Sequence, residues 1–208
     1  MSVSFRMKKN LFSQLYNFCQ TLDIPVTRGE LIPKAVEIAG AQKIRAIWVD
    51  LTSDKIRGRF VRANNHDSQW YKFMKAENVI ALSSSLKADG KGNGNKCWER
   101  FIFVKEAMHL FDDADESTAT PESYEALLQD LENGAYYTSK QSQSDAMAVW
   151  MALGCLCPEK NRQDFIEKRK SGFIDNFGIA TQLKIPEKHI DKLLSENFSK
   201  IIGELTQQ

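Results

Sequence analysis

The chain has 208 residues, which is enough for one domain of ordinary size with a substantial hydrophobic core. Its 28 lysine and arginine residues are balanced by 27 aspartate and glutamate residues, so no overall basic field favours general binding to nucleic acid. No apolar run approaches the roughly 20 residues of a membrane-spanning helix, and the basic N-terminal stretch lacks the apolar core of a secretory signal. We therefore expect a cytoplasmic protein without a membrane partner.

The four cysteines support the same compartment. Cys19, Cys97, Cys155 and Cys157 form neither a CxxC pair nor the spacing of a disulfide scaffold. They are predicted to be reduced and mostly buried thiols.

The first elements are predicted to be helices. Residues Phe5 to Leu22 place apolar side chains at intervals of three and four, which is typical of an amphipathic helix. Thr27 and Glu30 have the spacing of a capping box for a second helix through Ile38, with Gly40 as its stop. Pro33 lies inside that helix unless the helical part begins only two residues before it.

The pattern then changes to the alternation of strands. Ile44–Leu51, Ile56–Ala63 and Val79–Ser83 predict three strands with tight connections, which favours a small antiparallel sheet. His66–Tyr71 is predicted to be a polar and aromatic loop. Ala88–Asn95 is rich in glycine, asparagine and lysine but lacks the spacing of a phosphate-binding loop, so it is also predicted to be a loop.

The stretch Trp98–Phe111 is predicted to be one amphipathic helix that carries Lys105, Glu106 and His109. A zinc-peptidase helix has a histidine, a glutamate one residue later and a second histidine four residues after the first. One turn then presents two imidazoles to a metal beside a general base. Here Lys105 stands in place of the first imidazole.

The remaining elements are mostly helical. An acidic run after the Trp98 helix is predicted to be a solvated turn, because it lacks the alternating ligands of a calcium loop. The elements expected after it are a helix from Pro121 to Asn133, an apolar helix from Asp145 to Leu156 capped by Ser142 or Ser144, a charged surface helix from Glu159 to Lys170, and helical segments from Phe173 to Leu205 with a break at Pro186.

This order of elements predicts an α+β fold, and particular residues resemble a known family. Arg100-Phe101, Lys105-Glu106 and His109 precede, by about three dozen residues, an alanine-rich helix that ends in Cys155-Leu156-Cys157-Pro158. These motifs resemble the ImmA/IrrE-type metallopeptidase domain over roughly residues 10–165. The resemblance implies a zincin-like minimal metallopeptidase fold with a small three-stranded sheet beside the active-site helix. It divides the chain into a peptidase-type domain, 1–170, and a C-terminal helical segment, 171–208.

The resemblance also implies roles for the site residues. Glu106 corresponds to the general base and His109 to the second imidazole ligand. Asp145 is the acidic third ligand, as the only acid nearby. Counting back from Pro158 instead places Met147 at a position where the family often has a carboxylate.

Lys105 leaves three interpretations open. His109 and Asp145 supply only two zinc ligands, and a catalytic zinc usually has three; His66 or Cys97 would have to complete the set. Alternatively, the ammonium group takes the place of the cation and neutralises Glu106 and Asp145, so that no cofactor is needed. In the third interpretation Lys105 and Glu106 are an ordinary exposed pair.

The C-terminal segment offers a function of another class. Residues 178–194 have the pattern of a helix-turn-helix, with a second helix led by Glu187. Glu187 and Asp191 oppose binding to DNA, whereas three lysines favour it: Lys184, Lys188 and Lys192. Packing of this segment onto the preceding domain is the competing interpretation.

The resemblance finally implies a partner. Proteins of this family commonly cleave or bind helix-turn-helix repressors in bacteria and phages. We therefore expect binding to such a regulator by a metal-free pseudopeptidase. The alternatives are cleavage of the regulator by a zinc-dependent endopeptidase with altered ligands, and DNA binding through the C-terminal helices.

Overall fold

The computed structural model describes residues 3–51, 56–62, 69–87, 96–113, 116, 130 and 139–206. Three sequence predictions fall outside these residues: the loop Ala88–Asn95, the position of His66, and the helix Pro121–Asn133 apart from Asp130.

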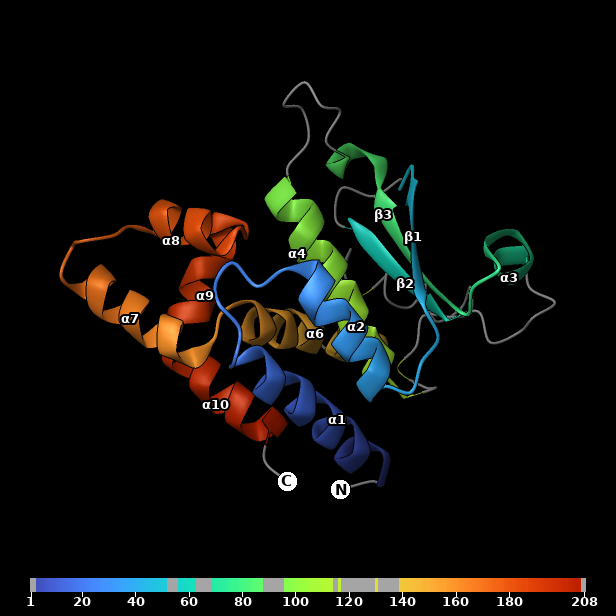
Figure 1. Cartoon of the computed structure of the whole chain (residues 1–208), viewed down its shortest axis with the longest axis horizontal. Coiled ribbons are helices and arrows are strands. Elements are labelled where there is room, and N and C mark those ends of the chain that lie inside the picture. The colour runs from blue at the N-terminus through green and yellow to red at the C-terminus, as the bar shows by residue number, and fades with distance from the viewer. Residues whose placement is uncertain are drawn as a thin grey trace.

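The fold is α+β, with a small mixed sheet and many helices (Figure 1). The helix α4 runs through the middle of the molecule, between the sheet on one side and the helices of the second half of the chain on the other (Figure 1). The sheet, the N-terminal helices and the C-terminal helices therefore all position the side chains of α4. In chain order the elements up to α4 are α1 (Val3–Cys19), α2 (Arg28–Ile38), β1 (Ile44–Val49), β2 (Gly58–Arg62), α3 (Gln69–Met74), β3 (Asn78–Ser83), a 3₁₀ turn η1 (Ser84–Leu86) and α4 (Lys96–Ala107).

The sheet has the strand order β1-β3-β2. β3 pairs in parallel with β1 and antiparallel with β2, so the prediction of an antiparallel sheet is wrong for one of the two pairings. The reason is that β3 inserts between the two earlier strands, and every residue of β3 is buried. Part of the predicted loop His66–Tyr71 is also helical, because α3 begins at Gln69.

The second helix follows its predicted signals. Thr27 accepts a hydrogen bond from the backbone N–H of Glu30, and the Glu30 side chain returns one to the backbone of Thr27, which completes the capping box. At the other end Gly40 adopts a left-handed conformation, φ 59°. The N–H groups of Gly40 and Ala41 then bind the carbonyls of Glu37 and Val36, which satisfies the helix end. Pro33 lies inside this helix.

The stretch that was predicted to be one helix has two parts. The α-helical part ends at Ala107, and residues Met108–Phe111 form a tighter 3₁₀ turn, η2. Lys105 and Glu106 therefore lie in the last turn of α4, whereas His109 lies in η2. Residues Phe101 to Ala107 are all buried, so this part of α4 has no face exposed to solvent.

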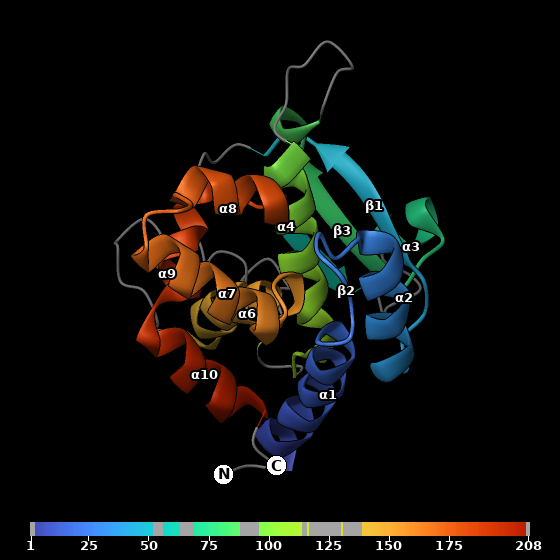
Figure 2. The ribbon, with the colours of Figure 1, turned by 60° about the vertical axis from the view of Figure 1, so that its left-hand side comes forward.

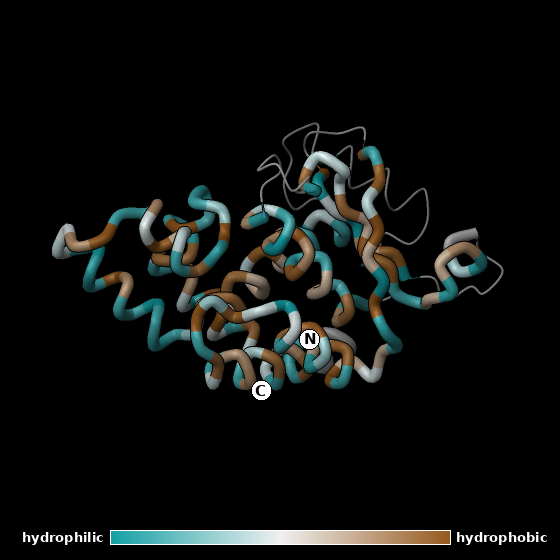
Figure 3. Tube along the Cα trace, turned by 45° about the horizontal axis from the view of Figure 1, so that its top comes forward, coloured by the Kyte–Doolittle hydropathy of each residue, from teal (hydrophilic) through white to brown (hydrophobic). Residues whose placement is uncertain are grey.

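The later helices are α6 (Lys140–Leu156), α7 (Glu159–Lys170), α8 (Asn176–Leu183), a 3₁₀ turn η3 (Glu187–His189), α9 (Ile190–Leu194) and α10 (Glu196–Thr206). The helix α6 begins earlier than predicted because its cap is Ser139, whose side chain accepts from the N–H of Ser142. The bounds of α7 agree with the prediction, and its residues are mostly hydrophilic (Figure 3). The predicted break at Pro186 is confirmed, and a second break occurs at Ser195.

The C-terminal helices share a core with the rest of the chain. Buried side chains of α8, α9 and α10, among them Ile179, Leu193 and Phe198, belong to the same apolar cluster as Phe12 of α1 and Phe101 of α4. The helices α1 and α10 lie side by side, α9 packs against α6, and the end of α8 lies against α4 (Figure 2). The packing interpretation of the C-terminal segment is confirmed. Within the part of the chain that the structure describes, no helix combines the length and the apolarity needed to cross a bilayer.

Gly58 is the point at which the sheet touches the end of α4. A Cβ atom at this position would lie 2.4 Å from Ile102 Cγ2 and 2.9 Å from Glu106 Cγ. We expect Gly58→Ala to lower the free energy of unfolding by about 1–3 kcal/mol, because both neighbours are buried and cannot move freely. Urea denaturation followed by circular dichroism measures this loss.

Gly203 in α10 provides the matched control, because a Cβ atom there would meet nothing within 4 Å. Gly203→Ala should stabilise the protein by about 0.5–1 kcal/mol, since alanine is the better helix former. Equal effects of the two substitutions would contradict the close approach of β2 to Glu106.

Candidate functional site

Lys105 lies between two carboxylates. Its Nζ atom donates to Glu106 Oε1 at 2.8 Å and also to Asp145 Oδ1. Lys105 and Glu106 come from the last turn of α4, and Asp145 comes from α6, which packs against it. These three side chains therefore meet, as the sequence predicts. Asp145 of α6 accepts the hydrogen bond from Lys105, and Met147, the other candidate position, has no carboxylate to offer.

The contact of Lys105 with Glu106 is buried, and its contact with Asp145 is partly buried. The side chains of Lys105 and Glu106 are 10% and 3% exposed, so the interpretation of Lys105 as an exposed, snorkelling side chain is wrong. Burial by itself would lower the pKa of Lys105, but Asp145 and Glu106 raise it above its ordinary value. Burial likewise would raise the pKa of Asp145, but Lys105 and His109 hold it well below its ordinary value. The ammonium and the carboxylate are therefore both ionised.

His109 is held on the other side of the same carboxylates. Its Nδ1 atom lies 2.6 Å from Asp112 Oδ2, and its Nε2 atom lies 3.8 Å from both Glu106 Oε2 and Asp145 Oδ1. Burial by itself would lower the pKa of His109, but Asp112, Asp145 and Glu106 raise it to about 10. The ring therefore carries a positive charge at neutral pH.

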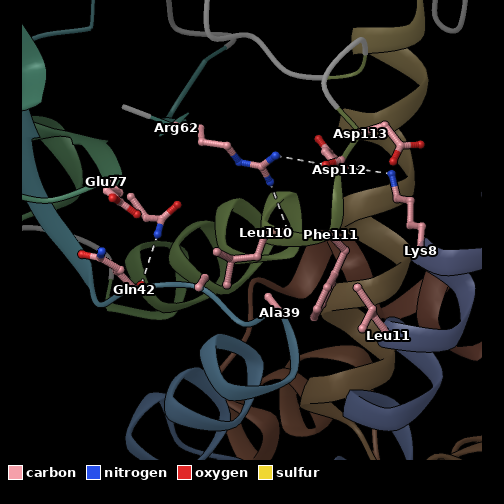
Figure 4. A pocket seen from close by; sticks show the side chains of 12 residues that line it. Lys8, Leu11, Ala39, Gln42, Arg62, Glu77, Leu110, Phe111, Asp112 and Asp113 are labelled. Carbon is pink, nitrogen blue, oxygen red and sulfur yellow. Dashed lines mark hydrogen bonds and ion pairs between the residues drawn. The ribbon is translucent and has the colours of Figure 1, made fainter. Parts of the chain in front are cut away.

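Asp112 joins this site to the N-terminal helix. Its Oδ1 atom accepts from Lys8 Nζ at 2.8 Å (Figure 4). The same oxygen accepts from Ser144 Oγ at 2.7 Å. Lys8 also binds Glu116 at 2.9 Å. The result is a continuous network in which positive and negative groups alternate from α1 through η2 to α4 and α6. We call it the Lys105 network, and its members are Lys8, Lys105, Glu106, His109, Asp112, Glu116, Ser144 and Asp145.

Sequence reasoning missed half of this network. The acidic run was predicted to be a solvated turn, which is wrong for Asp112, since its side chain is 4% exposed. Ser144 was considered only as a helix cap and instead is buried inside α6. A signal did exist for Lys8, because it lies four residues before Phe12 on the apolar face of α1. A lysine in such a position needs a buried counter-ion.

A cavity of about 310 Å³ adjoins the Lys105 network at Asp112. Arg62 of β2 lies in its wall and donates to the backbone carbonyls of His109, Leu110 and Asp112 (Figure 4). The guanidinium group thereby satisfies carbonyls at the C-terminal end of η2, where a cation is favoured by the partial negative charge of such an end. Arg62 thus fixes the segment that carries His109.

The residues present do not fit a catalytic zinc ion. Lys105 places an ammonium group between Glu106 and Asp145. An ammonium group cannot ligate a metal, so His109 and Asp145 are left as two ligands where a catalytic zinc usually has three. Within the described residues no group of three or more histidine, cysteine, aspartate or glutamate side chains has the arrangement to hold a metal. Of the two residues proposed to complete the set, His66 is outside the described residues. Cys97 lies at the opposite end of α4, about 12 Å from Lys105 along the helix axis.

The charge on His109 predicts how stability depends on pH. A pKa raised from about 6.5 to about 10 means that its contribution is fully present below pH 6.5 and is lost as the pH rises towards 10. Between these values the free energy of unfolding should fall by up to about 1.4 kcal/mol per pH unit for this one proton. His109→Gln should remove that slope. Urea unfolding at pH 6, 7, 8 and 9 measures the difference, and equal slopes would show that His109 is not a cation.

His189 supplies a control of opposite sign. Burial, followed by Lys188 and Lys192, lowers the pKa of His189 to about 3. Its contribution is therefore present above pH 6.5 and is lost as the pH falls towards 3. His189→Gln should flatten the acid side of the stability curve and leave the alkaline side unchanged.

The segment with the helix-turn-helix pattern packs on α4. Arg100 of α4 donates to the carbonyls of Leu183 and Lys184 at 2.7 and 2.9 Å, and also to the carbonyl of Val26. The ring of His189 stacks on Phe101 with centroids 4.1 Å apart. The expected recognition helix is a 3₁₀ turn followed by the five-residue helix α9. These contacts hold the turn after α8, and the start of the expected recognition helix, against α4.

No protein-family model, curated protein or solved structure matches the chain.

Proposed function

We propose that the chain is a metal-free pseudopeptidase of zincin-like architecture that acts in the cytoplasm by binding a helix-turn-helix transcriptional regulator. The observation that carries this proposal is the position of Lys105, buried between Glu106 and Asp145. Its fixed ammonium group neutralises the two carboxylates that would otherwise face a metal ion. The similarity of the sequence motifs to the ImmA/IrrE-type domain supports the choice of partner.

The chemistry of the site supports binding without cleavage. Hydrolysis of a peptide needs an activated water and a polarised carbonyl, both of which a zinc ion supplies in active members of such families. Lys105 is protonated and so cannot act as a base, and Glu106 is engaged by Lys105. No step in this arrangement generates a nucleophile. The scaffold around α4 remains available to hold a partner.

One observation favours the alternative, a metal-dependent endopeptidase with altered ligands. The contact between His109 Nδ1 and Asp112 has the form of the carboxylate–histidine pair that orients a zinc ligand, with Nε2 turned towards Glu106 and Asp145. This alternative requires Lys105 to move away or lose its proton. Its raised pKa opposes the second of these.

Metal content separates the two functions. Protein purified without chelators from a zinc-supplemented culture should contain far less than one zinc per chain by elemental analysis. A stoichiometric metal that survives dialysis would overturn the pseudopeptidase and support the endopeptidase.

The proposed partner is tested by cross-linking in cells followed by reconstitution. We expect a helix-turn-helix regulator among the cross-linked proteins, and we expect the purified pair to co-elute in size-exclusion chromatography with the regulator intact. A regulator that is cut during incubation contradicts the absence of hydrolysis. Failure to recover any regulator contradicts the partner.

A further inference from the structure

A cluster of cations and tryptophans lies outside the Lys105 network. The guanidinium carbon of Arg57 is 4.1 Å from the centroid of the Trp98 ring, and Lys188 Nζ is 4.2 Å from the same centroid. One turn later, Lys192 Nζ is 4.7 Å from the centroid of the Trp150 ring. These five residues, which we call the Trp98 patch, come from the approach to β2, from α4, from α6 and from the η3–α9 segment.

The cations of the Trp98 patch lack acidic partners in the described part of the chain. Elsewhere some lysines of surface helices pair with carboxylates: Lys34 with Glu37, and Lys168 with Asp164. In contrast, Arg57, Lys188 and Lys192 form no ion pair with a described residue. Burial first, and then the charges of Arg57 and Lys192, lower the pKa of Lys188. The positive charge of Lys188 is therefore less favourable here than in water, and a bound anion would offset this cost.

This local charge is compatible with a balanced composition. The chain has a net charge of only +1, so a basic surface has to arise from the way the fold gathers its cations. Lys188 is exposed, and Arg57, Lys192 and both tryptophans are partly exposed. Each of the five residues therefore has some surface that a ligand can contact.

We propose that the Trp98 patch binds single-stranded nucleic acid. Two partly exposed indole rings beside three cations match the combination of stacking platforms and backbone-tracking charge used by single-strand binders. A guanidinium group that lies over a ring keeps its edge free to donate to a phosphate. On binding, Lys188 and Lys192 move from the rings to phosphates, and unstacked bases take their places on Trp98 and Trp150.

The same geometry selects this ligand over two others. Bases in a duplex are stacked on one another and cannot cover an indole ring. The five-residue α9 packs against α6, α7 and α10 instead of presenting a recognition surface. An acidic peptide would use the three cations but would leave both tryptophans without a role.

The test measures the binding of a labelled oligothymidylate of about 12 nucleotides by fluorescence anisotropy at salt concentrations between about 50 and 200 mM. Neutralising three phosphates predicts a log–log salt slope of about −2, from about −0.7 for each phosphate on a single strand. The variant Arg57→Gln/Lys188→Gln/Lys192→Gln should bind at least about tenfold more weakly at the lowest salt. A charge-matched control, Lys43→Gln/Lys160→Gln/Lys200→Gln, changes three exposed lysines elsewhere and should bind as the wild type does.

Two further measurements separate a loss of binding from a loss of folding and test the role of the tryptophans. Thermal melting shows that the triple variant is folded, and the single change Lys188→Gln should reduce the salt slope by about 0.7 even if the triple variant unfolds. Bound oligonucleotide should also quench tryptophan fluorescence in the wild type, and less so in Trp150→Phe. Absence of binding at the lowest salt, equal binding by the folded triple variant, tighter binding to a duplex of equal phosphate content, or equal competition by polyglutamate would each overturn the proposal.

Discussion

Replacing Lys105 with methionine is expected to lower the free energy of unfolding by about 3 kcal/mol, because it leaves the buried carboxylate of Glu106 and the partly buried carboxylate of Asp145 without their shared cation. The methionine fills a similar volume, so the loss measures charge and not a cavity. Glu106 is 2% exposed and cannot turn to water, and among the described residues Asp145 would keep His109 as its neighbouring cation. A loss of this size is a large fraction of the stability of an ordinary domain.

The control is a lysine whose ion pair is exposed. Lys34 pairs with Glu37 at 2.6 Å, and the two side chains are 33% and 67% exposed. Lys34→Met should change the free energy of unfolding by less than about 1 kcal/mol, because water screens such pairs. Both variants are measured by urea denaturation at pH 7.

A second variant shows whether the carboxylates cause the loss. Lys105→Met combined with Glu106→Gln and Asp145→Asn removes both negative charges and should recover most of the stability. If Lys105→Met alone costs less than about 1 kcal/mol, or if the triple variant is no more stable than the single one, the two carboxylates do not depend on Lys105.

The parts of the fold that depend on neighbouring residues were predictable from the sequence. Thr27 with Glu30 and the stop at Gly40 fix the ends of α2 by local hydrogen bonds, and the charged pattern of α7 ends where Gly172 turns left-handed. The sheet order was not predictable in this way, because the insertion of β3 between β1 and β2 is not a local property. The continuous apolar run of Val79–Ser83 was nevertheless a signal, since a strand buried on both faces belongs in the middle of a sheet.

The residues of the candidate site likewise differ in whether local sequence spacing predicts them. Lys105, Glu106 and His109 were found because they lie within one turn and a half of a helix, and Asp145 was found through its place in the next motif. Lys8 and Asp112 are 104 residues apart, and no spacing rule connects them. The 3₁₀ turn at Met108–Phe111 was also missed, because its residues have the same apolar spacing as the helix before it.

Replacing Lys105 with histidine is expected to create a zinc site. The change restores two histidines four residues apart with Glu106 after the first, and Asp145 lies beside them as a third ligand. Ligands of a tetrahedral zinc lie about 3.3 Å apart when the metal–ligand bonds are about 2.0–2.1 Å long. His109 Nε2 and Asp145 Oδ1 are 3.8 Å apart, so the two donors need to move by only a few tenths of an ångström each.

Asp112 should strengthen this new site without touching the metal. Its contact with His109 Nδ1 turns Nε2 towards the position of the ion, and bound zinc would displace the proton that Nε2 now carries. We expect one zinc per chain in Lys105→His by elemental analysis and by titration. Adding Asp112→Asn should weaken that affinity by about 10–100-fold.

The control for zinc binding is Lys105→Gln, which removes the ammonium group without supplying a ligand and should bind no zinc. If it binds as well as Lys105→His, the metal uses donors other than residue 105, and Lys105 only blocks a site that is otherwise complete. If neither variant binds, the 3₁₀ turn holds His109 too far from the end of α4 for the two imidazoles to share an ion. In that case Lys105 cannot be standing where a metal would lie, and its role is confined to neutralising Glu106 and Asp145.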